Sequence, residues 1–443
     1  MRGGKFGEVH KIGNAVDTIT ACLGAVVAGV ALFLPINFSW TTESSAYRMA
    51  SLNNSVPRGA AIGVIVAVAV AVLVITFDKQ VAAWAAALCA AVAMDVNHFA
   101  GRNVSSADML TTQNYLDSIL AGVLLGALGV AVLRRPGPAA GFAIGGAGFF
   151  VFGDPSELLE IVTGNPHAVL ETPPRWLIGV AVVLLIISTL RNRSQPEESR
   201  SPRIAIELPV TPILASMVLA LVILAITEWL ARQYQHAPDV SHAVEIGMAV
   251  AATVIAATAA AMLLPGRDGY GVYLAVCLVA AADAIGGNTR PGWSVAALLA
   301  LTALGLLVGI RLPSMFIAIV LIAGLAIFAL VKSTNDHRFV IAAAGGALAL
   351  TAGYCCGAAW PRYAPSGVLA ISALYLPSII TALPRDSNEW PPAGSADHQT
   401  LAGRTALAIV CGSALGLVIL RRFRPRRRPK PDHPTEGETL ADI

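Results

Sequence analysis

The sequence predicts an all-α bundle that crosses a membrane many times, and composition and the spacing of apolar runs both indicate this. Of the 443 residues, 56% are hydrophobic and only 13% are charged, and the mean hydropathy is +0.69. A soluble protein would carry roughly a quarter charged residues. Apolar runs near the roughly 20 residues that a helix needs to cross a bilayer recur from end to end. These features exclude a soluble enzyme, a nucleic-acid-binding domain and a fibrous protein.

About fourteen apolar segments are expected to form membrane-spanning helices. Short polar or charged connections separate them, so each segment is expected to be antiparallel to the next. The expected spans are residues 15–35, 58–76, 81–98, 114–133, 138–153, 175–190, 208–230, 245–264, 271–286, 292–310, 313–331, 339–358, 366–383 and 402–420.

Lysine and arginine concentrate in alternate connections, which predicts the orientation of the chain. Because cytoplasmic loops carry the excess of basic residues, both termini are expected in the cytoplasm. The Ala-rich composition resembles that of high-GC actinobacterial membrane proteins, which implies a bacterial plasma membrane. After the last span comes a basic block, which is expected to contact anionic lipid head groups. Its residues are Arg421, Arg422, Arg424, Arg426, Arg427, Arg428 and Lys430.

The longest cytoplasmic connection, 191–207, predicts a division of the chain into halves. Its run of proline, serine and charged residues is typical of a solvated linker. The expected division is a six-helix half at 1–190, the linker, a second six-helix half at 208–358, two additional spans at 359–420, and a disordered cytoplasmic tail at 421–443.

Matching charged positions suggest that the two halves repeat one another. Cys89 stands six residues before Asp95, which stands seven before Arg102, and Cys277, Asp283 and Arg290 repeat these spacings. Arg134-Arg135-Pro136 is likewise echoed by Arg311-Leu312-Pro313 at a turn between two spans. Two six-span halves joined by a cytoplasmic linker are the layout of one large class of transporters.

Over residues 12–360 the chain resembles the major facilitator superfamily. That family carries a Gly-x-x-x-Asp-Arg/Lys-x-Gly-Arg pattern at the turn between its second and third spans. Asp78-Lys79 retains part of this pattern here, and Gly266-Arg267-Asp268-Gly269 lies at the equivalent turn of the second half. The two spans after the twelve depart from the family, whose fourteen-span drug exporters insert the extra pair between the halves.

Two acids within apolar runs require an explanation, because an ionised carboxylate at membrane depth costs several kcal/mol unless it is paired. Asp95 and Asp283 could relay protons as the transporter alternates between inward-open and outward-open states. The structural alternative pairs each acid with the arginine seven residues later, Arg102 or Arg290. The sequence favours the structural alternative without deciding between them.

The resemblance places a cavity among the first, fourth, seventh and tenth spans. Asp117 and Glu228 are the acids expected to face it near the outer side, and Glu245 could join them. His98, His236 and His242 also lie on the outer side, but without the spacing of metal ligands on one helix face. No cofactor, metal or nucleotide site is expected, since no matching motif occurs.

Three functions remain open from the sequence. The leading hypothesis is a secondary transporter or flippase for a small solute or a lipid-linked envelope precursor, coupled to protons if these acids titrate. The first alternative is a non-catalytic membrane subunit of an envelope-assembly or secretion complex, with a protein partner. The second is an outer-face polyprenyl-dependent glycosyltransferase, whose acids would be Asp154, Glu157 and Glu160.

Overall fold

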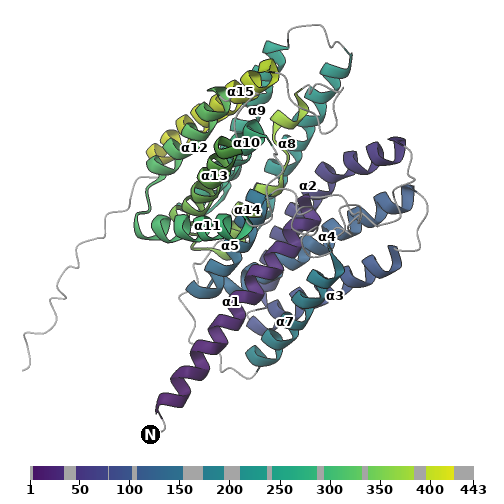
Figure 1. Cartoon of the computed structure of the whole chain (residues 1–443), viewed down its shortest axis with the longest axis vertical. Helices are drawn as coiled ribbons and strands as arrows, with labels where there is room; N and C mark the ends of the chain where they lie inside the picture. The colour runs from purple at the N-terminus through teal and green to yellow at the C-terminus, as the bar shows by residue number, and fades with distance from the viewer. Residues whose placement is uncertain are drawn as a thin grey trace, which may run out of the picture.

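The computed structural model describes residues 3–33, 46–77, 79–101, 107–152, 173–193, 210–236, 242–286, 294–331, 338–383 and 396–423, and these residues form helices joined by turns, without a strand (Figure 1). The linker from residue 194, the tail from residue 424 and the acids Asp154, Glu157 and Glu160 lie outside the described residues.

Every expected span coincides with a helical segment. The first half contains α1 (Gly3–Phe33), α2 (Ala46–Thr76), α3 (Gln80–Gly101), α4 (Ala107–Val132), α5 (Pro136–Phe152) and α7 (Arg175–Arg193). The rest of the described chain contains α8 (Thr211–His236), α9 (Ala243–Leu263), α10 (Tyr270–Ile285), α11 (Ser294–Arg311), α12 (Met315–Val331), α13 (Arg338–Ala358), α14 (Ala364–Ser372) and α15 (Ala396–Phe423).

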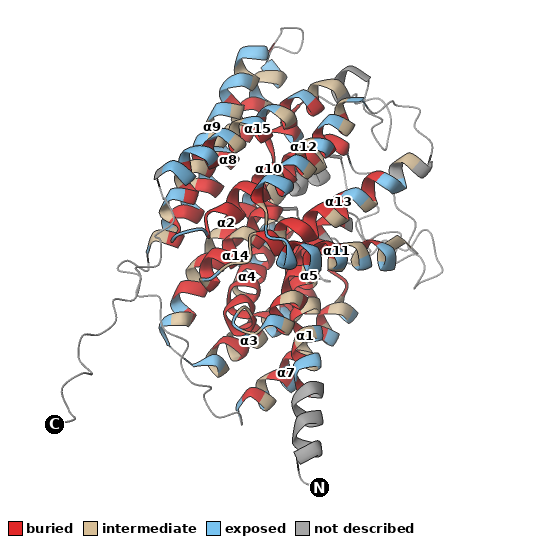
Figure 2. Cartoon of the chain, turned by 90° about the vertical axis from the view of Figure 1, so that its left-hand side faces the viewer, coloured by how far each residue is buried: buried red, intermediate tan, exposed pale blue. Residues whose placement is uncertain are grey.

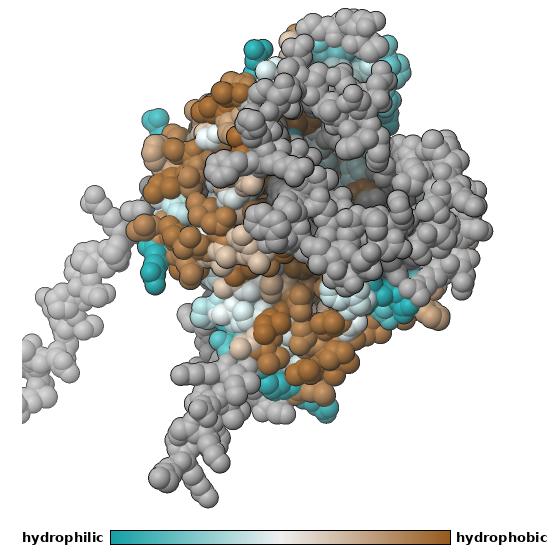
Figure 3. All heavy atoms as spheres, viewed as in Figure 1, coloured by the Kyte–Doolittle hydropathy of each residue, from teal (hydrophilic) through white to brown (hydrophobic). Residues whose placement is uncertain are grey.

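The helices present an apolar surface of the kind that lipid covers. Ten of the described helical segments are long and apolar enough to cross a membrane, and three apolar ones are shorter. Large apolar side chains such as Leu73, Val183, Ile255 and Phe316 are exposed. Figure 3 shows hydrophobic residues dominating the face over α12 and α15. A soluble monomer rarely exposes so large an apolar area, so the chain is a multi-pass membrane protein.

The helices of the first half pack in a definite pattern. The pair α2 and α4 makes the most extensive contact, α1 packs on α5, and α3 packs on both α4 and α7. The last six helices repeat it: α11 packs on α13, α10 packs on α14 and α15, and α12 packs on both α13 and α15. In contacts, α10 to α15 therefore correspond in order to α1 to α5 and α7.

Glycines explain the close approach in the two matching pairs. A Cβ on Gly122 or Gly126 of α4 would collide with the backbone of α2. In the second half, Gly305 and Gly309 of α11 lie equally close to the backbone of α13, as small residues permit at membrane helix interfaces. The same kind of contact thus recurs at the same place in each half.

This packing groups the helices differently from the division expected from the sequence. The pair α8 and α9 packs together, α8 also lies on α2, and α9 lies on α15. We infer that α8–α9 is a pair inserted between the halves, and that residues 359–420 complete the second half. The proposed register of residues 89–102 with 277–290 does not fit these contacts, because α3 corresponds to α12 and α10 to α1. Hydropathy alone counts spans without showing which pair is the insertion.

The thirteenth span is a broken helix at the centre of the molecule. After α14 come two 3-10 turns, η2 (Ala373–Tyr375) and η3 (Ile379–Ala382). Pro377 lacks a backbone N–H, and the Ser378 hydroxyl accepts a hydrogen bond from the Ile380 N–H at 3.2 Å, so the chain restarts at η3. The segment packs between α2 and α4 on one side and α8 and α10 on the other, where Figure 2 shows mostly buried residues.

Candidate functional site

A polar cavity of about 580 Å³ lies between α2, α4, α8 and η3. It joins the first half to the inserted helix α8, at the end of the bundle that the expected topology places outside. We call it the outer vestibule. Its lining residues are Ser55, Pro57, Arg58, Thr111, Tyr115, Leu224, Thr227, Glu228, Ala231, Arg232, Gln235, Thr381 and Ala382.

An ion pair crosses the outer vestibule. Arg58 of α2 donates to Glu228 of α8 through Nε at 2.6 Å and Nη2 at 3.1 Å. Arg232, one turn further along α8, approaches the same carboxylate at 3.6 Å. Two guanidinium groups thus share one carboxylate, so the described lining of the vestibule carries a net positive charge. Glu228, a candidate from the sequence, is therefore a vestibule residue, and its partner Arg58 was not anticipated.

Below the ion pair, hydrogen bonds join α2 to α4. Asn114 donates to the Ser55 hydroxyl at 2.9 Å, and the Ser118 hydroxyl donates to the Asn114 carbonyl at 2.9 Å. All three side chains are buried. Because α2 and α4 meet through small residues here, this wall of the vestibule is held in one register.

The described residues near the centre of the bundle are mostly apolar. A cavity of only about 40 Å³ lies among α5, α10, α13 and α14, and its lining includes Phe142, Leu274, Cys355 and Ile371. The resemblance implied a polar cavity among the first, fourth, seventh and tenth spans. The polar cavity that the described residues form lies instead at the outer end, between α2, α4, α8 and η3.

Asp117 does not line the vestibule. It projects from α4 toward α3, where its Oδ2 lies 3.3 Å from Nε2 of His98, and both side chains are almost fully buried. The partnership could not be read from the sequence, because the two residues stand on successive spans whose rotation the apolar pattern does not define.

The two acids that were expected to pair with arginines along the chain lie in different surroundings. Asp95 pairs with Arg175 at the start of α7, at 3.3 Å, and that guanidinium also lies over the Phe99 ring. Asp283 is half-buried near the end of α10. Arg102 and Arg290 lie outside the described residues.

Glu245 and the outer histidines form a local contact. His242 Nδ1 lies 3.8 Å from Glu245 at the start of α9, and its ring packs edge-on against Tyr234. His236 ends α8, and its ring contacts the Arg232 carbonyl. Within the described ranges no three histidine, cysteine or acidic side chains gather as a metal would require.

Of the predicted inside turns, that of the second half is well defined. Asp268 is buried, and its carboxylate accepts the backbone N–H of Arg362 at 3.2 Å and of Tyr363 at 2.9 Å. Arg267 is exposed and lies over the Tyr270 ring. In the first half Lys79 is exposed, and Asp78 lies outside the described residues.

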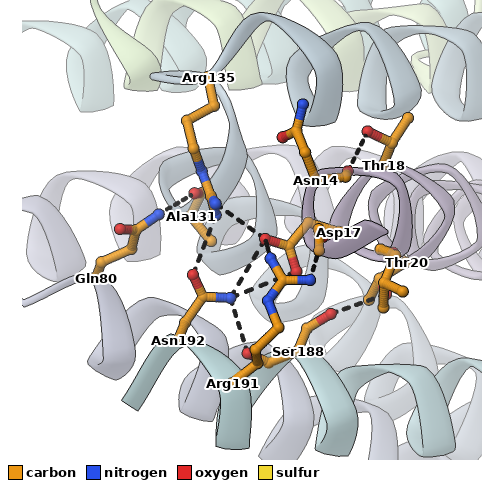
Figure 4. Close-up of polar contacts among 12 residues, drawn as sticks. Asn14, Asp17, Thr18, Thr20, Gln80, Ala131, Arg135, Ser188, Arg191 and Asn192 are labelled. Carbon is orange, nitrogen blue, oxygen red and sulfur yellow. Dashed lines mark hydrogen bonds and ion pairs between the residues drawn. The ribbon is translucent and has the colours of Figure 1, made fainter. Parts of the chain in front are cut away.

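A charge network at the opposite end of the first half was not anticipated (Figure 4). Asp17 of α1 is fully buried and contacts Arg135 at 2.9 Å and Arg191 at 2.7 Å. Asn192 also donates to Asp17, and Arg135 donates to Asn192. The sequence carried a signal for this network: Asp17 lies inside the first apolar run, and Arg135 and Arg191 flank later spans at the same side of the membrane.

No protein-family model and no curated protein matches the sequence. Solved structures do resemble it. A D-xylose–proton symporter gives a TM-score of 0.51 at 14% identity, covering 93% of this chain and 97% of that one. The major facilitator superfamily proton:xylose symporter XylE, bound to 6-bromo-6-deoxy-D-glucose, gives 0.50 at 12% identity over 93% and 96%.

The tetrameric PepTSo2 structure gives a TM-score of 0.50 at 12% identity, covering 94% of this chain and 99% of that one. Identity at this level shows likeness of fold. The chain therefore has a major-facilitator-like fold, as the sequence resemblance implied.

Proposed function

We propose that this protein is a secondary transporter that takes a small polar solute from the outer vestibule. The observation that carries the proposal is the Arg58–Glu228 ion pair, which joins the first half to α8 across a polar cavity of about 580 Å³. A cavity of this volume accommodates a small molecule. Transporters of this architecture work by rocking one half against the other. Because α9 packs on α15 of the second half, we expect the α8–α9 pair to move with that half, so that the ion pair spans the moving boundary.

The charges of the vestibule favour a solute with an anionic group. Arg58 and Arg232 share the single carboxylate of Glu228, so a carboxylate or phosphate on the solute would find a guanidinium able to bind it. Thr111, Tyr115 and other residues with hydroxyl groups also line the cavity. The fold is that of proton-driven symporters, which supports an ion gradient as the driving force.

Uptake into proteoliposomes tests the proposal. The purified full chain is reconstituted, and accumulation of radiolabelled D-xylose, dialanine and a panel of small carboxylates is measured with and without an inward proton gradient. Uptake above that of protein-free liposomes is expected for at least one compound. The variant Arg58→Gln should reduce that uptake at least tenfold. The control Arg311→Gln removes an exposed arginine at the last residue of α11, outside the vestibule lining, and should leave uptake unchanged.

If every compound equilibrates no faster than in protein-free liposomes, and the outer ends of α4 and α9 hold one fixed separation under all conditions, the transporter proposal is wrong. That separation can be measured between spin labels at Met109 and Val244, which are exposed and lie outside the vestibule lining.

A further inference from the structure

The His98–Asp117 pair is buried inside the first half, away from the vestibule lining. The side chain of His98 is 0% exposed and that of Asp117 is 2% exposed, and Nε2 lies 3.3 Å from Oδ2. They face one another across the α3–α4 contact, with fully buried Met94 and Ala121 one turn away on the same helices. A buried polar group is unfavourable unless it is hydrogen-bonded, so this pair depends on the contacts that each partner makes.

One oxygen of this carboxylate lacks a donor. Asp117 Oδ1 is buried and has no hydrogen-bond partner among the described residues. The side-chain oxygen of Gln113, Oε1, is likewise buried without a donor. Gln113 precedes Asp117 by four residues, so the two side chains are neighbours on one face of α4. Two acceptors on one face of α4 therefore lack a donor among the described residues, and a proton bound to the carboxyl would supply one.

We propose that Asp117 is the proton-binding site of the transport cycle. In the deprotonated state the imidazole Nε2–H of His98 donates to Oδ2. A proton taken up at Oδ1 turns this oxygen into an O–H donor directed at Gln113 Oε1, which satisfies both acceptors and removes the buried charge. The role rests on the proposed transport function, whereas the proton binding itself can be measured without a solute.

The position of α4 connects this site to the vestibule. Thr111 and Tyr115 line the vestibule from one face of α4. From another face Asp117 contacts His98 of α3, and the backbone carbonyl of Gln113 accepts a hydrogen bond from Asn97 of α3. Neutralising Asp117 weakens its attraction to His98 and frees α4 to shift against α3. The same movement displaces the vestibule wall, so proton binding and vestibule opening become linked.

The described charged groups on the helices around this pair contact other partners. Asp95 of α3 is held by Arg175 of α7. On α2, Arg58 is turned to Glu228, and Tyr115 of α4 faces the vestibule. At the opposite end Asp17 binds Arg135 and Arg191, and α5 and α14 carry no acidic or basic residue. The side chains of Arg102 and Asp108 lie outside the described residues.

Infrared difference spectroscopy of the full chain in lipid tests the proton site. Acidification of the wild type should produce the carbonyl band of a buried protonated carboxylic acid, and Asp117→Asn should abolish it. Asp95→Asn, the matched control at the same end of α3, should retain it. Gln113→Leu keeps the carboxyl but removes the acceptor of the neutral form, so the band should appear only at lower pH.

A band that persists in Asp117→Asn, or a midpoint that Gln113→Leu leaves unchanged, would overturn the proton-site proposal. Coupling is tested with whichever compound the wild type takes up. Asp117→Asn should lose gradient-driven accumulation but keep solute exchange, and unaltered accumulation would overturn the coupling role. If the wild type takes up no compound, the transport proposal fails while the infrared result still decides the proton site.

Discussion

Asp17 and Arg191 meet at 2.7 Å although 174 residues separate them, and the carboxylate is fully buried while the guanidinium is partly exposed. Arg191 also donates to the Gly13 carbonyl, and Arg135 reaches Asp17 from the α4–α5 turn. The carboxylate of Asp17 therefore joins α1, the α4–α5 turn and α7 at one end of the first half, and the outer vestibule lies at the opposite end.

Replacing Asp17 by asparagine is expected to destabilise the first half by about 3 kcal/mol, because removing one partner of a buried ion pair leaves uncompensated charge. The unfolding free energy in lipid or detergent measures this. Ile19→Val, at an exposed position on the same helix, should change it by less than about 0.5 kcal/mol. Equal effects of the two substitutions would show that the network contributes nothing.

The sequence predicted the helices well because each span is a long apolar run, and such a run has few structures available to it in a membrane. Glu228 could be chosen as a candidate site residue from the sequence, because an acid within an apolar run is rare. The broken segment after α14 was not foreseen, because Pro377 near the end of an apolar run is compatible with both a kinked and an interrupted helix.

The contacts between helices were much less predictable. Arg175 as the partner of Asp95, and His98 as the partner of Asp117, depend on how each helix is rotated about its axis. Spans rich in alanine, valine and leucine carry a weak signal for rotation, since lipid and neighbouring helices are both apolar. Glycines that meet a neighbouring backbone, as in the α2–α4 and α11–α13 pairs, are a sequence signal for close helix contacts.

Gly126→Ala is expected to destabilise the protein by about 1–3 kcal/mol, the range for an overpacked interior site. The added Cβ would meet the backbone of α2 at Ala67, which cannot move aside as a side chain could. Gly324→Ala on α12 is the matched control, because nothing lies within 4 Å of its Cβ position. Thermal unfolding of both variants tests the prediction, and an unchanged midpoint for Gly126→Ala would contradict the close packing.

Asp268 gives a prediction with a defined sign in pH. Burial raises the pKa of its carboxyl above the ordinary value, and the amides of Arg362 and Tyr363 oppose the rise only in part. Since the folded-state pKa exceeds the unfolded-state pKa, the group's contribution to stability is fully present at acid pH and is lost as pH rises through the folded pKa. The unfolding free energy of the wild type minus that of Asp268→Asn should therefore fall over this window and then level off.

Thermal unfolding of the wild type and Asp268→Asn between about pH 4 and pH 8 measures the difference. Asp268→Asn removes the charge but also leaves one amide oxygen in place of two carboxylate oxygens. The lost acceptor should lower the unfolding free energy of the variant by about 1 kcal/mol. A difference that grows with pH would mean that the backbone hydrogen bonds outweigh burial.

Breaking the Arg58–Glu228 pair is expected to change vestibule opening more clearly than stability. The two side chains are 48% and 30% exposed, and pairs of this kind contribute about 0.2–1 kcal/mol. Glu228→Gln should therefore leave the unfolding midpoint nearly unchanged. Because the pair joins the first half to α8, the same free energy should raise the open-to-closed ratio by a factor of roughly 1.5 to 5.

The charge exchange Arg58→Glu with Glu228→Arg provides the decisive comparison. Each single substitution places like charges together and should favour the open vestibule, whereas the double variant restores attraction and should return the distance distribution between labels at Met109 and Val244 toward that of the wild type. Recovery of the distance without recovery of uptake would mean that Arg58 also binds the solute, since the exchanged pair keeps the contact but reverses the charge on each wall. A double variant as open as the singles would exclude the ion pair as the contact that closes the vestibule.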